Sequence, residues 1–83
     1  MFKAVVTVMM KKSVLDPQGA AVERALKSMG HSGIESVRIG KSIEILLDGR
    51  DADEVKAKVA DWADQLLANP IMETYTVRVE KMS

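Results

Sequence analysis

The sequence predicts an α+β two-layer sandwich in which two helices lie against one face of a four-stranded, mainly antiparallel sheet. Four segments alternate apolar and polar residues with a period of two, which is typical of strands. Two others repeat apolar residues at steps of three and four, as amphipathic helices do. Their order is strand, helix, strand, strand, helix, strand, which indicates this sandwich. Residues 1–83 are expected to form a single domain.

The first strand is predicted over Phe2 to Met10, where every even position is apolar. A loop then leads to Asp16, which can cap a helix, and to Pro17, whose missing N–H suits the first helical position. This helix is expected to run to about Met29 and to end at Gly30, which tolerates a positive φ. Its apolar face consists of Val22, Ala25, Leu26 and Met29.

The middle of the chain is predicted to form a β-hairpin. Its two strands cover Ile34 to Ile39 and Ser42 to Asp48, and both alternate in the manner of strands. Gly40 and Lys41 stand between them and are expected to form the turn.

The second helix starts from a segment that resembles a capping box, Asp51-Ala52-Asp53-Glu54. Apolar residues follow at steps of three and four up to Leu67. Asn69-Pro70 is expected to stop the helix near Ala68, because proline lacks a backbone N–H and disfavours helical geometry at the preceding residue. A last strand is predicted from Ile71 to Val79.

The second face of this sheet would lack a helical cover. If the even positions of the first strand face the helices, Val5 and Met9 lie on the other face. Leu46 and Met72 are apolar residues on the faces of their strands that are otherwise mostly polar. We expect these four residues to form an oligomer interface, because a contiguous exposed apolar patch marks a contact surface. The alternative is a hydrated face with scattered apolar residues.

The composition argues against several classes of protein. Twelve Lys and Arg balance twelve Asp and Glu, and Lys11-Lys12 is too short for a basic tract, so nucleic acid is not an expected partner. No apolar run approaches the roughly 20 residues that span a bilayer, and no signal-peptide pattern is visible. The absence of cysteine fits a reducing compartment. We therefore expect a cytoplasmic protein that acts without a membrane.

No catalytic, cofactor or metal site is predicted on this chain. The single histidine, His31, lies in a small polar loop without a nucleophile or a second metal ligand nearby. The carboxylates of Asp51, Asp53 and Glu54 are better explained by helix capping than by acid–base catalysis. Gly40-Lys41 leads into a strand rather than a helix, so a turn is preferred to a phosphate-binding loop.

Four strings, taken in order, are more specific than periodicity. They are Val14-Leu15-Asp16-Pro17-Gln18-Gly19 with Ala25-Leu26, Val37-Arg38-Ile39-Gly40-Lys41, Leu66-Leu67-Ala68-Asn69-Pro70, and Glu73 with Tyr75. In this combination the chain resembles the PurS family, the small subunit of bacterial and archaeal phosphoribosylformylglycinamidine (FGAM) synthase. The resemblance covers nearly the whole chain, although Ser13 stands where the family often has glycine.

The resemblance implies a non-catalytic subunit of a three-component ligase of purine biosynthesis. A glutaminase subunit would release ammonia, and a large ATP-dependent synthetase subunit would use it to convert formylglycinamide ribonucleotide (FGAR) to FGAM. ATP, magnesium and glutamine would belong to these partners. The small subunit would bridge them as a homodimer or higher homo-oligomer. Its implied contacts are Asp16, Pro17, Gln18, Gly19, Arg38, Gly40, Lys41, Asn69, Pro70 and Glu73.

Most of these contact residues also have a purely structural explanation. Asp16 and Pro17 start a helix, Gly40 permits a turn, and Asn69-Pro70 stops the second helix. Arg38 and Lys41 are the exceptions, because neither backbone geometry nor burial accounts for them.

Two other functions compete with that of an adaptor subunit. One is a regulatory dimer module that binds a small effector, which would need a pocket of convergent polar groups. The other is a small enzyme of acylphosphatase type, which would need a phosphate-binding loop after the first strand. Lys11 to Leu15 lacks the glycines and the arginine of such a loop.

Overall fold

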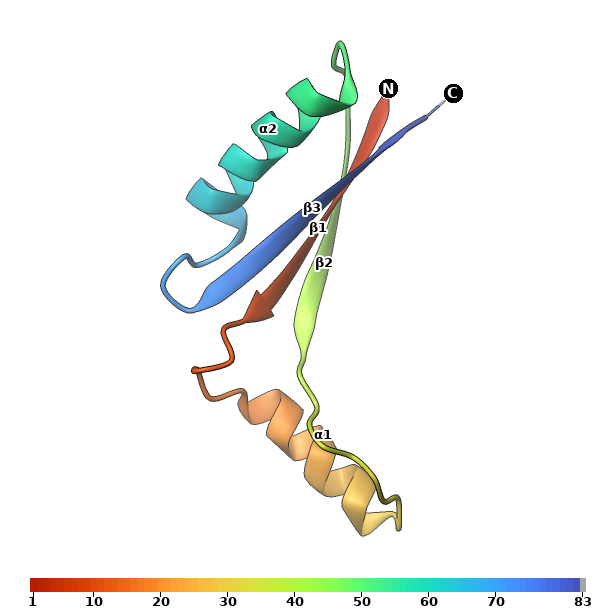
Figure 1. Cartoon of the computed structure of the whole chain (residues 1–83), viewed down its shortest axis with the longest axis vertical. Coiled ribbons are helices and arrows are strands. Elements are labelled where there is room, and N and C mark those ends of the chain that lie inside the picture. Colours follow the sequence, from red (N-terminus) through yellow and green to blue (C-terminus); the bar gives the residue numbers. More distant parts are fainter. Residues whose placement is uncertain (83) are drawn as a thin grey trace.

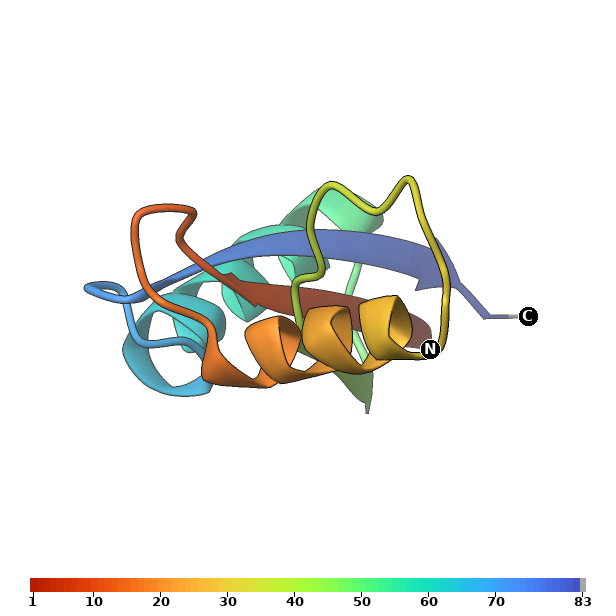
Figure 2. The same ribbon diagram turned by 90° about the horizontal axis from the view of Figure 1, so that it is seen from below.

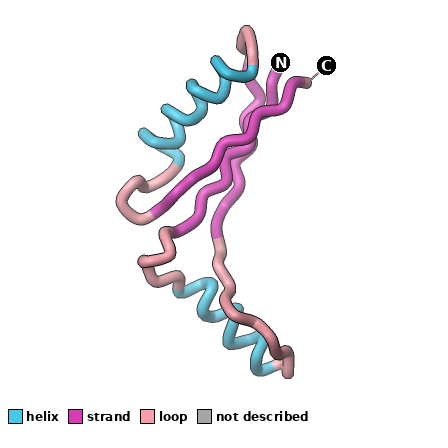
Figure 3. The backbone as a smooth tube through the Cα atoms, viewed as in Figure 1, coloured by secondary structure: helices cyan, strands magenta, loops and turns pink. Residues whose placement is uncertain are grey.

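The computed structural model describes residues 1–82, which form one antiparallel sheet, two α-helices and one π-helical turn (Figures 1 and 3). The strands follow the order β2-β1-β3, so that the first strand is central and pairs antiparallel with both neighbours. The elements are β1 (Phe2–Met10), α1 (Pro17–Ser28), β2 (Gly40–Leu47), α2 (Ala52–Trp62), η1 (Ala63–Leu67) and β3 (Glu73–Lys81).

The even positions of β1 form the centre of the hydrophobic core. Val6 lies opposite Ile43 of β2 and Val77 of β3, and its side chain is fully buried. The other buried even positions are Phe2, Ala4 and Val8. The predicted first strand is therefore confirmed with the same bounds, and its period of two sets which face is apolar.

Helix α2 covers this apolar face. Asp51 caps the helix by accepting a hydrogen bond from the N–H of Glu54 at 2.9 Å, as the sequence predicts. Val55 and Val59 are fully buried against the sheet, and the Tyr75 hydroxyl of β3 donates to the Ala60 carbonyl at 3.2 Å. The last turn, η1, ends at Leu67 with Ala68 as its C-cap, close to where the sequence predicts the helix to stop.

Helix α1 does not cover the sheet. It lies beyond the end of β1 and β2, at the end of the molecule away from both termini (Figure 1), and is the nearest element when the molecule is viewed from that end (Figure 2). Residues 30–39, which we call the return segment, run back beside it towards β2. The radius of gyration is 16.2 Å, whereas a compact chain of this length would have about 12 Å. We call residues 17–39 the arm.

Three features of the predicted fold are wrong in this structure. The sheet has three strands rather than four, because Ile34 to Ile39 do not join it. Gly40 and Lys41 are not a hairpin turn, since Gly40 begins β2 opposite Met9. Only α2, not both helices, lies on the sheet.

The alternation of Ile34 to Ile39 has a different cause from strand pairing. These residues run beside α1, and their apolar side chains Ile34, Val37 and Ile39 are half-buried there. The backbone N–H of Ile39 donates to the Asp16 carboxylate instead of to a neighbouring strand. An apolar pattern that matches a strand thus belongs to a segment outside the sheet.

The apolar surface without a helical cover lies mainly where the sequence does not predict it. Ile43, Ile45 and Leu47 of β2 share the face that α2 covers, yet they are only half-buried, because α2 packs over β1 and β3. On the opposite face Val5 is only 9% exposed, between Glu44 and Arg78 in register, whereas Leu46 is 64% exposed. Most of that second face is polar.

No helix within residues 1–82 has both the length and the apolar character needed to cross a membrane.

Candidate subunit-contact site where the arm joins the sheet

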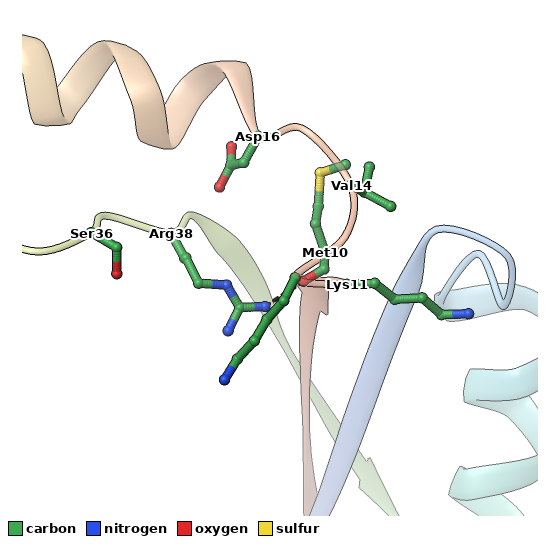
Figure 4. A pocket seen from close by; sticks show the side chains of 7 residues that line it. Met10, Lys11, Val14, Asp16, Ser36 and Arg38 are labelled. Atoms are coloured by element: carbon green, nitrogen blue, oxygen red, sulfur yellow. Dashed lines mark hydrogen bonds between the residues drawn. The ribbon is translucent and has the colours of Figure 1, made fainter.

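The candidate site lies where the arm meets the sheet. The C-terminal end of β1, the start of α1 and the end of the return segment converge there around an open pocket of about 380 Å³ (Figure 4). The pocket is lined by Met10, Lys11, Lys12, Val14, Asp16, Ser36 and Arg38.

Asp16 joins the start of α1 to the return segment. One carboxylate oxygen accepts a hydrogen bond from the N–H of Gly19 at 2.9 Å, which caps the helix, and the other accepts from the N–H of Ile39 at 2.9 Å. These bonds to the charged form lower the pKa of Asp16 from its ordinary value of 3.8, with a smaller contribution from the positive charge of Arg38. Asp16 is therefore more than a helix cap.

Gly19 and Gly40 allow the backbones to approach closely on the two sides of this junction. A Cβ added to Gly19 would lie 2.3 Å from the Val37 carbonyl oxygen, and one added to Gly40 would lie 2.2 Å from the Val8 carbonyl oxygen. Real Cβ atoms do not come so near to backbone oxygen. Both glycines are thus required by packing, and Gly40 does not form the turn predicted for it.

Arg38 crosses the pocket towards the end of β1 (Figure 4), where its guanidinium donates to the Met10 carbonyl oxygen. Its side chain is exposed, as are those of Lys12 and Lys41, and Lys11 is half-buried. Five ion pairs exist among residues 1–82, and none of them involves these four cations.

A second pocket, of about 190 Å³, adjoins the first through the shared residue Met10. It is lined by Met10, Gln18, Ile39, Gly40, Lys41 and Glu73. Six of the predicted contact residues therefore line one pocket or the other, namely Asp16, Gln18, Arg38, Gly40, Lys41 and Glu73. Pro17 and Gly19 lie in the first turn of α1 next to them.

Asn69 and Glu73 stabilise the turn before β3. The N–H of Asn69 donates to a Glu73 carboxylate oxygen at 2.7 Å, and the Asn69 side-chain oxygen accepts from the N–H of Ile71 at 3.0 Å. The N–H of Lys11 also donates to the Met72 carbonyl at 2.9 Å, which links this turn to the end of β1. Asn69, Pro70 and Met72 are exposed beside the junction.

The chain is similar to known proteins over nearly its whole length. The sequence profile of PurS, described as phosphoribosylformylglycinamidine (FGAM) synthase, matches residues 3–81. The chain belongs to the PurS family. The PurS subunit of FGAM synthase from Bacillus subtilis is 43% identical over 82 residues, which are 99% of this chain and 96% of that relative.

Solved PurS structures have the same fold as this chain. The crystal structure of PurS from Methanocaldococcus jannaschii, one of the subunits of formylglycinamide ribonucleotide amidotransferase, matches with a TM-score of 0.91, 36% identity and complete coverage of both chains. A chain in the structure of PurLQS from Thermotoga maritima matches with a TM-score of 0.85 and 30% identity, over 95% of this chain and 96% of that one. The three-stranded α+β architecture is thus that of PurS.

The PurS-like strings are the residues that build the junction. Asp16 and Gly19 come from the first string, and Arg38 and Gly40 come from the second. Arg38 reaches Met10, which is 28 residues away along the chain. Ser36 lines the first pocket without having been predicted as a contact, and so do Lys11 and Lys12, which are too short a run for a basic tract. A usable signal was the position of that pair, directly after a strand and just before a capped helix.

The residues considered for chemistry lie apart from the junction. His31 is exposed in the return segment, and Asp51 caps α2 while Glu54 accepts from Arg50 at 2.8 Å. Within residues 1–82, no group of three or more His, Cys, Asp or Glu side chains is placed to hold a metal ion. What the junction offers a partner is shape and charge.

Proposed function

We propose that this chain is the small, non-catalytic subunit of FGAM synthase and that it bridges the glutaminase and the ATP-dependent synthetase subunits. The observation that carries this proposal is the match over nearly the whole chain to a subunit within PurLQS of Thermotoga maritima. The complex would convert FGAR, ATP, glutamine and water to FGAM, ADP, phosphate and glutamate. ATP, magnesium and glutamine would all bind to the partner subunits.

A bridging subunit has a physical purpose in such a complex. Ammonia released into water at neutral pH is protonated and diffuses away from the activated substrate. A sealed interface keeps it neutral and close to the acceptor, which replaces a bimolecular step by a guided transfer. A single small domain that acts in the cytoplasm and supplies contact surface alone can perform this task.

We also propose that the chain works as a homodimer or higher homo-oligomer. The β2 part of the apolar face lacks a helix, and the chain carries one helix, α1, whose apolar stripe has no sheet beneath it. A second copy could place its α1 on β2 and receive the same cover in return, as a two-fold interface requires. The predicted patch of Val5, Met9, Leu46 and Met72 would be a further contact between copies.

The alternative of an effector-binding module is supported less well. It needs polar groups that converge in a pocket, and the first pocket does contain several. However, both carboxylate oxygens of Asp16 already accept backbone N–H groups, and Arg38 donates to the Met10 carbonyl.

The decisive experiment is reconstitution with the glutaminase and synthetase subunits from the same cell. We expect glutamine-dependent FGAM formation only when this chain is present, and a complex of the three in light scattering. Arg38→Ala should leave the chain folded and reduce the mass of the assembled complex. Equal activity without the chain, or an isolated chain that forms FGAM unaided, would refute the proposal.

A further inference from the structure

The junction carries more basic than acidic side chains. The chain as a whole has equal numbers of acidic and basic residues. Nevertheless Lys11, Lys12, Arg38 and Lys41 all line the two adjoining pockets, and none of them takes part in an ion pair with residues 1–82. Such a patch attracts a negatively charged surface.

The two carboxylates near these cations, those of Asp16 and Glu73, accept hydrogen bonds from backbone N–H groups. Asp16 accepts from the N–H groups of Gly19 and Ile39, and Glu73 accepts from the N–H of Asn69. Each of them therefore stabilises a turn or a helix start rather than a lysine. Four cations and only these two carboxylates line the pockets, so the junction has an excess of positive charge that the carboxylates of a partner can complement.

The geometry favours several separate carboxylates over one compact phosphate. Phosphate sites in proteins commonly use backbone N–H groups at a helix N-terminus, and here that place is taken by the Asp16 carboxylate. Arg38 points towards the end of β1, whereas Lys11 leads away from that point (Figure 4), so these two charges do not converge.

The pocket also has an apolar part. Met10 and Val14 line it beside the cations, and both are half-buried. An apolar side chain could pack there while acidic neighbours reach the lysines. Methionine suits such a contact because its flexible thioether adapts to different shapes.

We propose that the junction binds an acidic segment of a partner subunit, in which Asp or Glu side chains flank an apolar residue that enters the pocket at Met10 and Val14. This inference rests on the proposed function and adds the chemistry of the partner's contact. The acidic segment would dock across Lys11, Lys12 and Arg38.

The first test uses the isolated, isotope-labelled chain and two peptides. In one peptide glutamates flank a leucine, and in the other glutamines replace the glutamates. We expect the acidic peptide alone to shift the amide resonances of residues 11–14 and 36–38 in a saturable manner. The shifts should fade as salt is raised from about 0.1 M to about 1 M, where the Debye length falls from about 10 Å to about 3 Å.

The second test measures binding of the full chain to the partner subunits. Lys11→Gln with Lys12→Gln should weaken binding by about 4- to 25-fold, since exposed charge pairs contribute roughly 2- to 5-fold each. The matched control is Lys56→Gln with Lys81→Gln, which removes two exposed cations that form no ion pair within residues 1–82 and lie outside both pockets. We expect this control to leave affinity and salt dependence unchanged.

The outcomes separate this inference from the proposed function. If the wild-type chain does not join the partner subunits, the proposed function fails whatever the peptides do. If it joins them and the pocket variant binds as tightly as the control, the inference is overturned while the subunit role stands. Saturable shifts with inorganic phosphate but not with the acidic peptide would reveal a small-anion site and would also overturn the inference. A pocket variant that weakens assembly while the acidic peptide fails to bind the wild-type chain would overturn it as well.

Discussion

At the scale of single residues, a few side chains hold the arm in place. Asp16 bridges two backbone N–H groups that are 20 positions apart, those of Gly19 and Ile39. Gly19 allows the return segment to pass directly over the first turn of α1. Residues whose sequence context predicts only the start of a helix thus also make contacts with a distant part of the chain.

Gly19 provides a test in which two physical effects have opposite signs. Helix propensity alone predicts that Gly19→Ala stabilises the helix by about 1 kcal/mol. The added Cβ would lie 2.3 Å from the Val37 carbonyl oxygen, so we expect instead a loss of about 1–3 kcal/mol in unfolding free energy. Urea unfolding followed by circular dichroism measures the sign, and a more stable variant would contradict the close approach. Ala21→Gly at an exposed position of α1 calibrates the propensity effect.

Asp16 makes stability depend on pH in the acidic range. Its pKa is lowered in the folded state from an ordinary value of 3.8, so its contribution is complete above that value and is lost as the pH falls through the lowered pKa. Asp16→Asn should be less stable than wild type at neutral pH, and the difference should shrink below about pH 4. Urea midpoints measured at a series of pH values check this expectation. The control is Asp64→Asn, which removes the same charge at an exposed position. If the stability difference between Asp16→Asn and wild type stayed constant with pH, the expectation would be wrong.

At the scale of elements, the two helices contribute unequally to the core. Val55 and Val59 of α2 are fully buried, whereas Val22 of α1 is 39% exposed. Helix α2 contacts β1 and β3 extensively, while α1 lies beyond the sheet beside residues 30–39. The monomer's stability should therefore depend on one helix.

The same substitution in both helices measures this inequality. Val59→Ala should reduce the unfolding free energy by about 1.5–3 kcal/mol, because it removes buried methyl groups from the core. Val22→Ala should change it by less than about 0.5 kcal/mol when measured on dilute monomer. Equal losses in denaturant titrations would show that α1 packs on the sheet after all.

The sequence predicts well those features that depend on neighbouring residues. The period of two in Phe2 to Met10 and the caps at Asp16 and Asp51 all lie where predicted, because strand alternation and helix capping are set within a few residues. The sequence does not tell what an apolar stripe packs against. The backbone of residues 34–39 runs beside α1 and not beside a strand of the sheet, so a fourth strand and a second covering helix are wrongly predicted.

The candidate site was predictable for its residue types but not for its assembly. The family-like strings identified Asp16, Arg38 and Gly40, yet only the fold brings Arg38 to the Met10 carbonyl across 28 positions. The role proposed for the lysine pair at 11–12 depends on its lacking ion partners within residues 1–82, which is a property of the folded chain.

At the scale of the whole molecule, the chain is elongated, with extents of 50 × 30 × 15 Å, and has apolar residues exposed at several places, two of which are the arm and β2. Leu15 and Met29 flank α1 and are 77% and 71% exposed, and Ile43 to Leu47 border an uncovered area of the sheet. A lone copy would leave both surfaces in water. Association should therefore be part of its stability.

We expect the thermal midpoint of the isolated chain to rise with protein concentration over about a hundredfold range, because a folded oligomer is favoured by mass action. Val22→Glu should remove this dependence by placing a charge on the apolar stripe of α1. Ala21→Glu, at an exposed neighbouring position, should retain it. A wild-type midpoint that is independent of concentration would argue against contact through this stripe.

The attachment of the arm at one end of the sheet gives the molecule the properties of a lever. Helix α1 has 12 residues and hence a length of about 18 Å. A rotation of about 10° where Asp16 and Arg38 fasten it would carry its far end through about 3 Å. A subunit bound at the junction could in this way change the distance between a partner held by the far end of α1 and a partner held by the sheet.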